Sequence, residues 1–451
     1  MLEHRAAIVG EDATGIFAKM KRLAQSKMLR NVSVLMIGTL VAQAINLLAL
    51  PLLTRLFDAE AFGQFGTFMA ICAVLATVVT GRYNLAVMLP RLDAHASSAC
   101  RLAVCIAVGV SAALALVALG LLATGSSFLG LPPTLLLLAP IGVFFLGLQQ
   151  VFEVCAGRSK QFVLLAKVSV YAAFCAATFK LVAGWYFVGS DGSIGSEAVS
   201  ASTWLAVGSV LSPLVVVYWL SRNTGLPLSG MSPWTIKRCK VALKKYRQFP
   251  LYRAPKDAIN SLSQNLPIFL IGIYFSAPLV GFYVVAERLM KVPSVLVGAA
   301  LRKVIYQRAA QDFQQGRSLK PLITKTTTVL AITSALPFLA VGIFGPRLFE
   351  IVLGAEWASS GEIASWLSLW MFFVFINVPS VVCIPLLNLE RRFLKLELVF
   401  LCSRLAGFVI GALVLDDAVA AIAVFCGVSA LTNAITILLL VRASEETRDD
   451  C

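Results

Sequence analysis

The chain has 451 residues, of which 59% are hydrophobic and only 14% are charged. Soluble proteins carry roughly 45–50% apolar and about 25% charged residues, so this composition excludes a water-soluble fold. The 38 Lys and Arg outnumber the 23 Asp and Glu, but they lie between apolar blocks, where anionic lipid headgroups explain them better than nucleic acid does.

The apolar residues are concentrated in blocks of roughly 18–25 residues, the length needed to cross a hydrocarbon core about 30 Å thick. The chain is therefore predicted to be an all-α polytopic membrane protein with about twelve transmembrane helices. The predicted spans are 32–53, 62–83, 100–123, 132–151, 163–187, 199–220, 258–276, 279–301, 322–345, 362–387, 396–415 and 418–441.

The distribution of Lys and Arg predicts the orientation. Thirty-one of them lie in the N-terminal segment 1–30, the even-numbered loops and the C-terminal end (Arg442 and the tail 443–451), whereas the odd-numbered loops hold only Arg55 and Arg347. Basic loops stay on the cytoplasmic side, so both termini are predicted to be cytoplasmic. No short apolar stretch with a cleavage-like site follows the basic N-terminus, so we expect no removable signal peptide.

The first span carries a polar stripe. Thr39, Gln43 and Asn46 share one helical face. At an offset of 218 residues, the seventh span carries the counterparts Asp257, Ser261 and Gln264. These side chains either line a central cavity or form interhelical hydrogen bonds worth about 1 kcal/mol each.

The same offset indicates an internal repeat, because Phe57, Ala59 and Gly63 align with Phe275, Ala277 and Gly281. Six spans per half would give two six-helix lobes, 31–221 and 257–442, related by a parallel pseudo-two-fold axis along the membrane normal with a cavity between them. The basic segment 222–256 joins them. It is either an amphipathic helix on the inner membrane surface or a solvated linker.

The eighth span contains the strongest anomaly. Glu287, Arg288 and Lys291 lie near the expected bilayer centre, where a charge costs roughly 2.5–3.5 kcal/mol. Glu287 and Lys291 have the i, i+4 spacing of an ion pair, which leaves Arg288 uncompensated. Its guanidinium would suit a diphosphate oxygen; the alternative is an ion network between helices. Lys180 and Arg404 are the other deep cations and further candidates for the cavity wall.

No motif for catalysis or for a cofactor is found. The ten cysteines show no CxxC spacing, His4 and His95 lie in polar regions, and there is no Walker-type phosphate loop. We expect no metal, no cofactor and no enzymatic activity. The odd-numbered loops are short, which disfavours a membrane glycosyltransferase or polymerase with an outer catalytic domain.

Several motifs resemble bacterial polysaccharide biosynthesis proteins of the O-antigen flippase (Wzx) type. They occur in the expected order from about residue 30 to 440, and include Leu50-Pro51-Leu52-Leu53-Thr54-Arg55-Leu56-Phe57, Arg82-Tyr83-Asn84-Leu85-Ala86, Phe249-Pro250-Leu251-Tyr252, Gln264-Asn265-Leu266-Pro267, Ala286-Glu287-Arg288 and Leu353-Gly354-Ala355-Glu356-Trp357. Asn84 stands where the family often has an acidic residue.

The resemblance implies the multidrug/oligosaccharidyl-lipid/polysaccharide (MOP) exporter fold, with two lobes and alternating access. It also implies transport of an oligosaccharide linked to undecaprenyl diphosphate across the bacterial inner membrane, with membrane lipids, polysaccharide polymerase and export machinery as partners. The diphosphate would then be bound by Arg288, Lys291, Arg404 and Lys180. Glu287 would couple the transport cycle to proton movement. The sugar hydroxyls would be bound by Gln43, Asn46, Ser261 and Gln264. A drug antiporter of the same fold is the alternative, but it would require an anionic cavity.

Overall fold

The computed structural model describes residues 27–90, 92–125, 128–188, 200–224, 239, 241–315, 317–387 and 389–446, and all regular secondary structure in these ranges is helical. The N-lobe comprises α2 (Lys27–Leu53), α3 (Ala59–Val78), α4 (Tyr83–Ala86), α5 (Asp93–Ala123), α6 (Pro133–Arg158), α7 (Phe162–Ala183), the π-helix η1 (Gly184–Val188) and α8 (Ala201–Asn223). The second half comprises the π-helix η2 (Phe249–Arg253), α10 (Ala254–Tyr274), α11 (Ala277–Met290), α12 (Val292–Gln314), α13 (Lys320–Leu353), the 3₁₀-helix η3 (Ala355–Trp357), α14 (Ala358–Ile376), α15 (Val378–Cys383), α16 (Glu390–Val414) and α17 (Ala418–Glu446).

Ten of the described helical segments are long and apolar enough to cross a membrane, and they match ten of the predicted spans. The other two predicted spans, 258–276 and 279–301, fall on α10 and on α11–α12. Helix α11 has only 14 residues, too few to cross the hydrocarbon core alone, and α10 and α12 carry more polar residues than the ten apolar helices. The all-α membrane fold is confirmed, whereas the count of twelve spans stays a prediction.

Two predicted spans are interrupted. The eighth breaks at Lys291, because Pro293 lies in the first turn of α12 and cannot donate to the preceding helical turn. The tenth breaks at Asn377, where Pro379 opens α15 in the same way.

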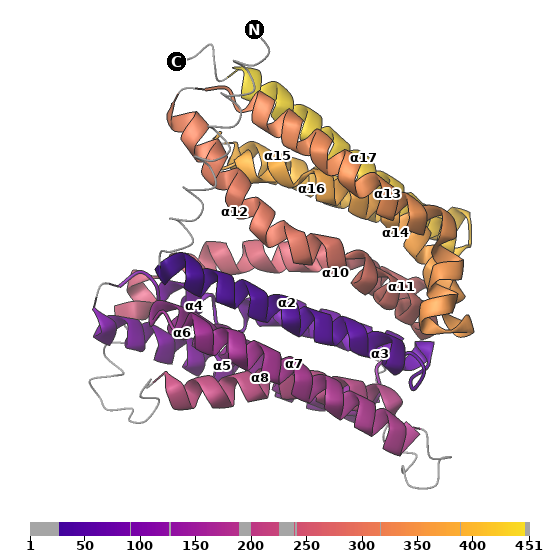
Figure 1. Cartoon of the computed structure of the whole chain (residues 1–451). Helices are drawn as coiled ribbons and strands as arrows, with labels where there is room; N and C mark the ends of the chain where they lie inside the picture. The colour runs from indigo at the N-terminus through magenta and orange to yellow at the C-terminus, as the bar shows by residue number, and fades with distance from the viewer. Residues whose placement is uncertain are drawn as a thin grey trace.

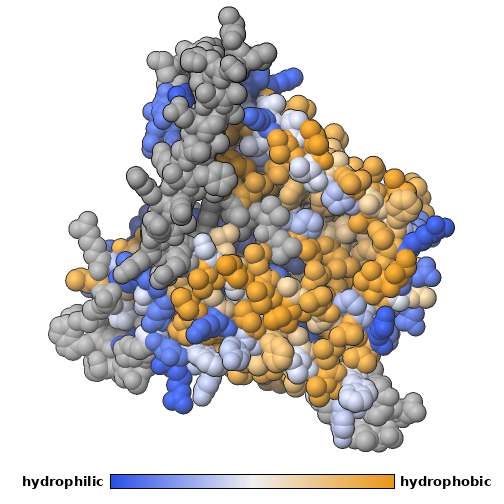
Figure 2. Space-filling view, viewed as in Figure 1, coloured by the Kyte–Doolittle hydropathy of each residue, from blue (hydrophilic) through white to orange (hydrophobic). Residues whose placement is uncertain are grey.

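The helices form two groups (Figure 1). Helices α2–α8 lie together, α12–α17 form the second group, which we call the C-lobe bundle, and α10 and α11 lie between them. The groups approach each other at the end that carries the α2–α3 turn, the α10–α11 turn and η3, which we call the Trp357 end, and diverge toward the opposite end. Figure 2 shows a broad apolar surface with polar residues toward both ends, as a bilayer requires.

The contact between α3 and α11 is reciprocal. A Cβ on Gly63 would lie 1.8 Å from the carbonyl oxygen of Ala277, and one on Gly281 would lie 1.9 Å from that of Ala59. The offset of 218 residues relates Gly63 to Gly281 and Ala59 to Ala277, so repeat-equivalent residues meet each other. Helices contact their own equivalents in this way at a two-fold axis, and only glycine permits this backbone approach.

The linker between the halves is described only in part, since residues 225–238 and 240 lie outside the described ranges. Residues 241–245 are helical. Ala242 is buried and packs, with Tyr246 and Phe249, against an N-lobe cluster around Tyr83. Tyr83 also donates a 3.2 Å hydrogen bond to the carbonyl oxygen of Leu243. Linker residues 242–249 therefore cover part of the N-lobe. An amphipathic helix on the membrane surface stays a prediction.

The predicted terminal segments also lie largely outside the described ranges. Only residues 27–30 of the N-terminal segment and residues 443–446 of the tail are described, and both continue adjacent helices. The lobe boundaries and the cytoplasmic placement of the termini stay predictions.

Candidate substrate site between the lobes

The charged segment of α11 forms the intrahelical pair that its spacing predicts. The Nζ of Lys291 lies 2.8 Å from the Oε1 of Glu287, whose side chain is only 10% exposed. Because the two residues are one helical turn apart, the pair forms without help from another helix. The ammonium group and carboxylate thus neutralise each other next to the break between α11 and α12.

Arg288, next to this pair, has no such partner. No carboxylate in the described part of the chain forms an ion pair with its guanidinium, and the Nη2 donates one long hydrogen bond, 3.5 Å, to the carbonyl oxygen of Asn46 on α2. The guanidinium is therefore held between α11 and α2 with most of its five donors free. A half-buried cation in this state attracts an anion with oxygen acceptors.

Lys180 brings a second positive charge to the same region. It lies on α7, is only 7% exposed, and its Nζ lies 5.3 Å from the centroid of the Phe65 ring on α3. Its stem passes Gly208 on α8, where a Cβ would lie 2.5 Å from the Cγ of Lys180. Phe65 belongs to α3, which packs against α11 through Gly63 and Gly66, so Lys180 and Arg288 lie on two helices that both border α3.

The polar stripes take different positions. On α2, Gln43 is exposed and Asn46 is half-buried, and the Nδ2 of Asn46 donates to the carbonyl oxygen of Ala42 (3.0 Å). On α10, Gln264 is exposed and Ser261 is half-buried. Gln43 and Asn46 therefore lie on α2, the helix that accepts the hydrogen bond of Arg288, and Ser261 and Gln264 lie on α10, between the two groups of helices. Within the described residues, none of these four side chains forms a hydrogen bond to another helix.

Asp257, the acidic member of the α10 stripe, is already paired. Its Oδ2 lies 2.9 Å from the Nε of Arg82, which follows α3, and 3.6 Å from the Nε of Arg253. This contact fixes the start of α10 to the N-lobe. It also removes a carboxylate from the set of groups free to meet a substrate.

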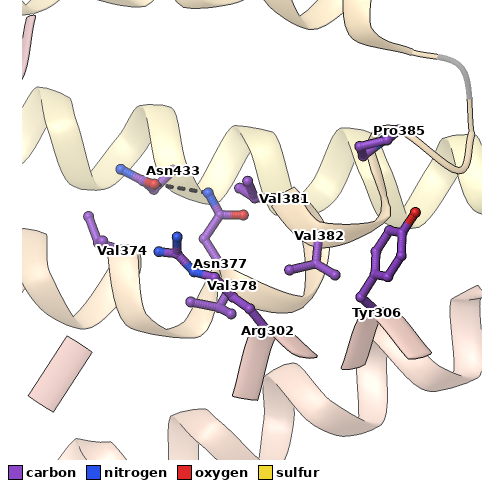
Figure 3. Close-up of a pocket in the computed structure, with 9 residues that line it drawn as sticks. All are labelled: Arg302, Tyr306, Val374, Asn377, Val378, Val381, Val382, Pro385 and Asn433. Carbon is purple, nitrogen blue, oxygen red and sulfur yellow. Dashed lines mark hydrogen bonds between the residues drawn. The ribbon is translucent and has the colours of Figure 1, made fainter. Parts of the chain in front are cut away.

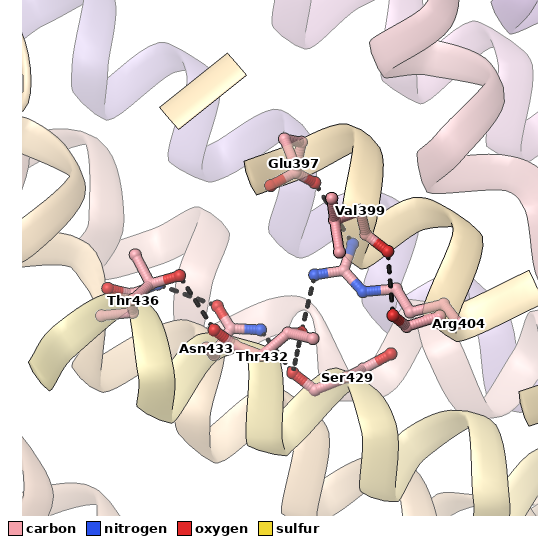
Figure 4. A network of polar contacts seen from close by, with 9 residues as sticks. Glu397, Val399, Arg404, Ser429, Thr432, Asn433 and Thr436 are labelled. Atoms are coloured by element: carbon pink, nitrogen blue, oxygen red, sulfur yellow. Dashed lines mark hydrogen bonds and ion pairs between the residues drawn. The ribbon is translucent and has the colours of Figure 1, made fainter. Parts of the chain in front are cut away.

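Arg404 lies in a separate network within the C-lobe bundle (Figure 4). Its Nη1 lies 3.3 Å from the Oε1 of Glu397, and its Nη2 donates a 3.0 Å hydrogen bond to the Oγ1 of Thr432 on α17. The structure does not bring Arg404 together with Arg288 and Lys180. Its contacts are those of a cation that joins α16 to α17.

The Trp357 end contains contacts that the sequence patterns do not reveal. Trp357 is 1% exposed, its Nε1 donates a 2.9 Å hydrogen bond to the carbonyl oxygen of Thr54, and Thr54 donates back to Leu353 (3.3 Å). The rings of Phe62 and Phe282 pack edge-on against the indole, 5.2 and 5.7 Å between centroids. We call these contacts the outer closure. Burying Trp357 requires residues some 300 positions away, so only its place in a family motif marks it in the sequence.

The chain matches the model of a family described as "Polysaccharide biosynthesis protein" over residues 52–362. It is 23% identical over 233 residues to the amylovoran biosynthesis protein AmsL of Erwinia amylovora, covering 51% of this chain and 55% of that protein. It is 18% identical over 175 residues to the teichuronic acid biosynthesis protein TuaB of Bacillus subtilis (strain 168), covering 37% of this chain and 36% of that protein. The chain thus spans about half the length, or less, of these curated relatives.

Two solved structures share the fold. The lipid II flippase MurJ in an inward closed conformation superposes with a TM-score of 0.69 at 12% identity, covering 92% of this chain and 89% of that one. An inward-facing MATE family multidrug resistance transporter of the MOP superfamily gives 0.66 at 12% identity, covering 94% and 99%. The predicted MOP-type architecture is thereby confirmed.

Proposed function

Because the chain belongs to the polysaccharide biosynthesis protein family, we propose that it is a flippase that moves a lipid-linked oligosaccharide across the membrane. The lipid is an undecaprenyl diphosphate, the membrane is the bacterial inner membrane, and the Trp357 end faces the periplasm. The MurJ-like fold and the names of the polysaccharide relatives support this proposal.

The observation that carries the proposal is the unpaired guanidinium of Arg288 between α11 and α2. A diphosphate would supply the oxygen acceptors that the described residues do not. Lys180, next to the Phe65 ring, adds to the positive potential of the site. The side chains of Gln43, Asn46, Ser261 and Gln264 offer hydrogen bonds to sugar hydroxyls. Lys291 remains paired with Glu287, so its part in binding requires that pair to open.

The transport cycle follows from the arrangement of the lobes. With the lobes closed at the Trp357 end, the headgroup enters from the cytoplasmic side and the polyprenyl tail stays in lipid. Opening of the outer closure then exposes the headgroup to the periplasm. Proton coupling through Glu287 is part of the same proposal.

The test uses purified protein in proteoliposomes that contain a fluorescent undecaprenyl-diphosphate oligosaccharide. Its translocation is followed by accessibility to an impermeant quencher. We expect Arg288→Ala to lower the rate by about 10²-fold, since losing a hydrogen-bonded charge contact costs roughly 2–3 kcal/mol. Arg288→Lys should be intermediate, because it keeps the charge and loses the fork.

Arg347→Gln serves as the matched control, since Arg347 lies on α13 at the Trp357 end and is exposed. Normal transport by Arg288→Ala, at equal expression and melting temperature, would refute the role of the guanidinium. A drug antiporter of the same fold would instead move organic cations and require an anionic site, which the unpaired cations oppose. Absence of any translocation by the wild-type protein, with drug efflux present, would favour that alternative.

A further inference from the structure

The C-lobe bundle contains a pocket that the proposed diphosphate site does not use (Figure 3). It has a volume of about 470 Å³ and lies between α12, α14, α15 and α17. This volume falls within the range of roughly 300–1,000 Å³ of small-molecule sites. One side is apolar and the other polar; the lining consists of Val374, Val378, Val381, Val382 and Pro385 together with Arg302, Tyr306, Asn377 and Asn433.

Two amides form the polar side. The Nδ2 of Asn377 donates a 2.9 Å hydrogen bond to the Oδ1 of Asn433. The Nδ2 of Asn433 donates in turn to the carbonyl oxygen of Ser429, at 2.8 Å. This leaves the Oδ1 of Asn377 without a partner among the described residues, although Asn377 is only 4% exposed. A buried acceptor without a partner destabilises the folded protein, and a ligand hydroxyl would satisfy it.

Arg302 supplies a positive charge to the same pocket. Figure 3 shows its guanidinium reaching toward Asn377 and Asn433. The side chain is exposed, and no acidic residue in the described ranges forms an ion pair with it. Tyr306, one helical turn further along α12, adds an aromatic ring to the rim of the pocket.

We propose that this pocket binds an acidic sugar ring of the transported headgroup; this inference rests on the proposed function. Arg302 binds the carboxylate through its planar fork. The Oδ1 of Asn377 accepts a hydrogen bond from a ring hydroxyl. The valine wall and Tyr306 cover the apolar face of the ring.

The combination of groups selects this ligand over simpler ones. A neutral sugar would leave Arg302 without an anion, and an acyl chain would leave both the amide acceptor and the guanidinium unsatisfied. The pocket also lies within reach of the Arg288 site. Arg302 follows Arg288 by 14 positions, roughly 21 Å along α11 and α12 at 1.5 Å per residue, a separation that one oligosaccharide headgroup can span.

The first experiment measures binding. The full chain is placed in nanodiscs of uncharged lipid, and glucuronate and glucose are titrated separately by saturation-transfer NMR. We expect wild-type protein to bind glucuronate at least tenfold more tightly than glucose. Arg302→Gln should abolish that preference, whereas Arg302→Lys should retain part of it. The matched control is Arg308→Gln, because Arg308 lies on the same helix but lines a different pocket.

Three outcomes would overturn the inference: equal binding of the two sugars by the wild type, an unchanged preference in Arg302→Gln, or loss of glucuronate binding when phosphatidylglycerol is added to the nanodiscs. The last would identify the pocket as a phospholipid site.

The second experiment measures translocation of lipid-linked disaccharides with and without a uronate. We expect Arg302→Gln to slow the acidic substrate at least fivefold and to leave the neutral one unchanged. If the wild type translocates neither, the proposed function fails while the binding result still decides the pocket. If the wild type translocates both and Arg302→Gln slows neither, the pocket assignment alone is wrong.

Discussion

The deep charges of this chain differ in how they are neutralised, and the difference separates structural from candidate binding residues. Arg404 is paired with Glu397 and bonded to Thr432, and Lys291 is paired with Glu287. Arg288 and Lys180 have no carboxylate partner within the described residues. An unpaired cation in a low-dielectric region destabilises the folded protein, so its presence there is consistent with a use other than stability.

Replacing Lys180 tests this interpretation. We expect Lys180→Met to increase the free energy of unfolding by roughly 1 kcal/mol, because it removes a desolvated charge at similar side-chain volume, and to slow translocation. Thermal unfolding in detergent and the liposome assay measure the two effects. Lys167→Met is the control, since Lys167 is exposed on the same helix. A lower melting temperature for Lys180→Met would mean that the contact with Phe65 outweighs the cost of burial.

At the scale of elements, α11 is the helix on which the site depends. It has only 14 residues, it packs against α3 through Gly281, and it carries both Arg288 and the Glu287–Lys291 pair. Its end at Lys291 lets α12 depart toward the C-lobe bundle. The helix therefore connects the outer closure to the Arg288 site, and α12, which follows it, leads to the Arg302 pocket.

Adding one methyl group at the crossing should separate α3 from α11. In Gly281→Ala the new Cβ would lie 1.9 Å from the carbonyl oxygen of Ala59, which is possible only if the backbones move apart. Overpacking of this kind costs about 1–3 kcal/mol. We expect faster hydrogen exchange at the first turns of α3 and α11, measured by mass spectrometry.

Gly120→Ala is the matched control for the crossing, because no atom lies within 4 Å of the position its Cβ would take. Exchange rates that are identical in Gly281→Ala and in the control would contradict the close contact.

At the scale of the whole molecule, the two groups of helices meet at the Trp357 end and diverge at the other (Figure 1). The outer closure joins α2, α3, α11 and η3 through one indole and its hydrogen bond to Thr54. In the proposed cycle this contact must break each time the lobes open outward. Its strength therefore sets the balance between the two conformations.

Trp357→Phe should weaken the outer closure, because it removes the hydrogen bond and keeps an aromatic ring in the same position. The ring remains apolar, but the carbonyl oxygen of Thr54 loses its donor, at a cost of about 1–3 kcal/mol. We expect hydrogen exchange near Thr54 and Trp357 to rise by roughly tenfold or more, with a changed translocation rate. Trp366→Phe is the control, since Trp366 is 44% exposed on α14. Protection that stays at the wild-type level would show that the aromatic packing alone holds this end.

The sequence by itself determined the features that depend on local composition and spacing. Block length predicted ten spans that the structure describes, because crossing a bilayer requires apolar residues in an unbroken run. The i, i+4 spacing predicted the Glu287–Lys291 pair, because one helical turn brings those positions together. The repeat offset aligned Gly63 with Gly281, and these two glycines meet where α3 crosses α11.

Only the tertiary structure decided which charges remain free and which distant residues meet. Arg288, Lys180 and Arg404 are equivalent as isolated deep cations, and their difference arises from neighbours on other helices or a second turn away: Asn46, Phe65, Glu397 and Thr432. The Arg302 pocket likewise joins residues from positions 302 to 433. Contacts at such separations depend on how the helices pack, and the periodicity of a single helix carries no information about its neighbour's position.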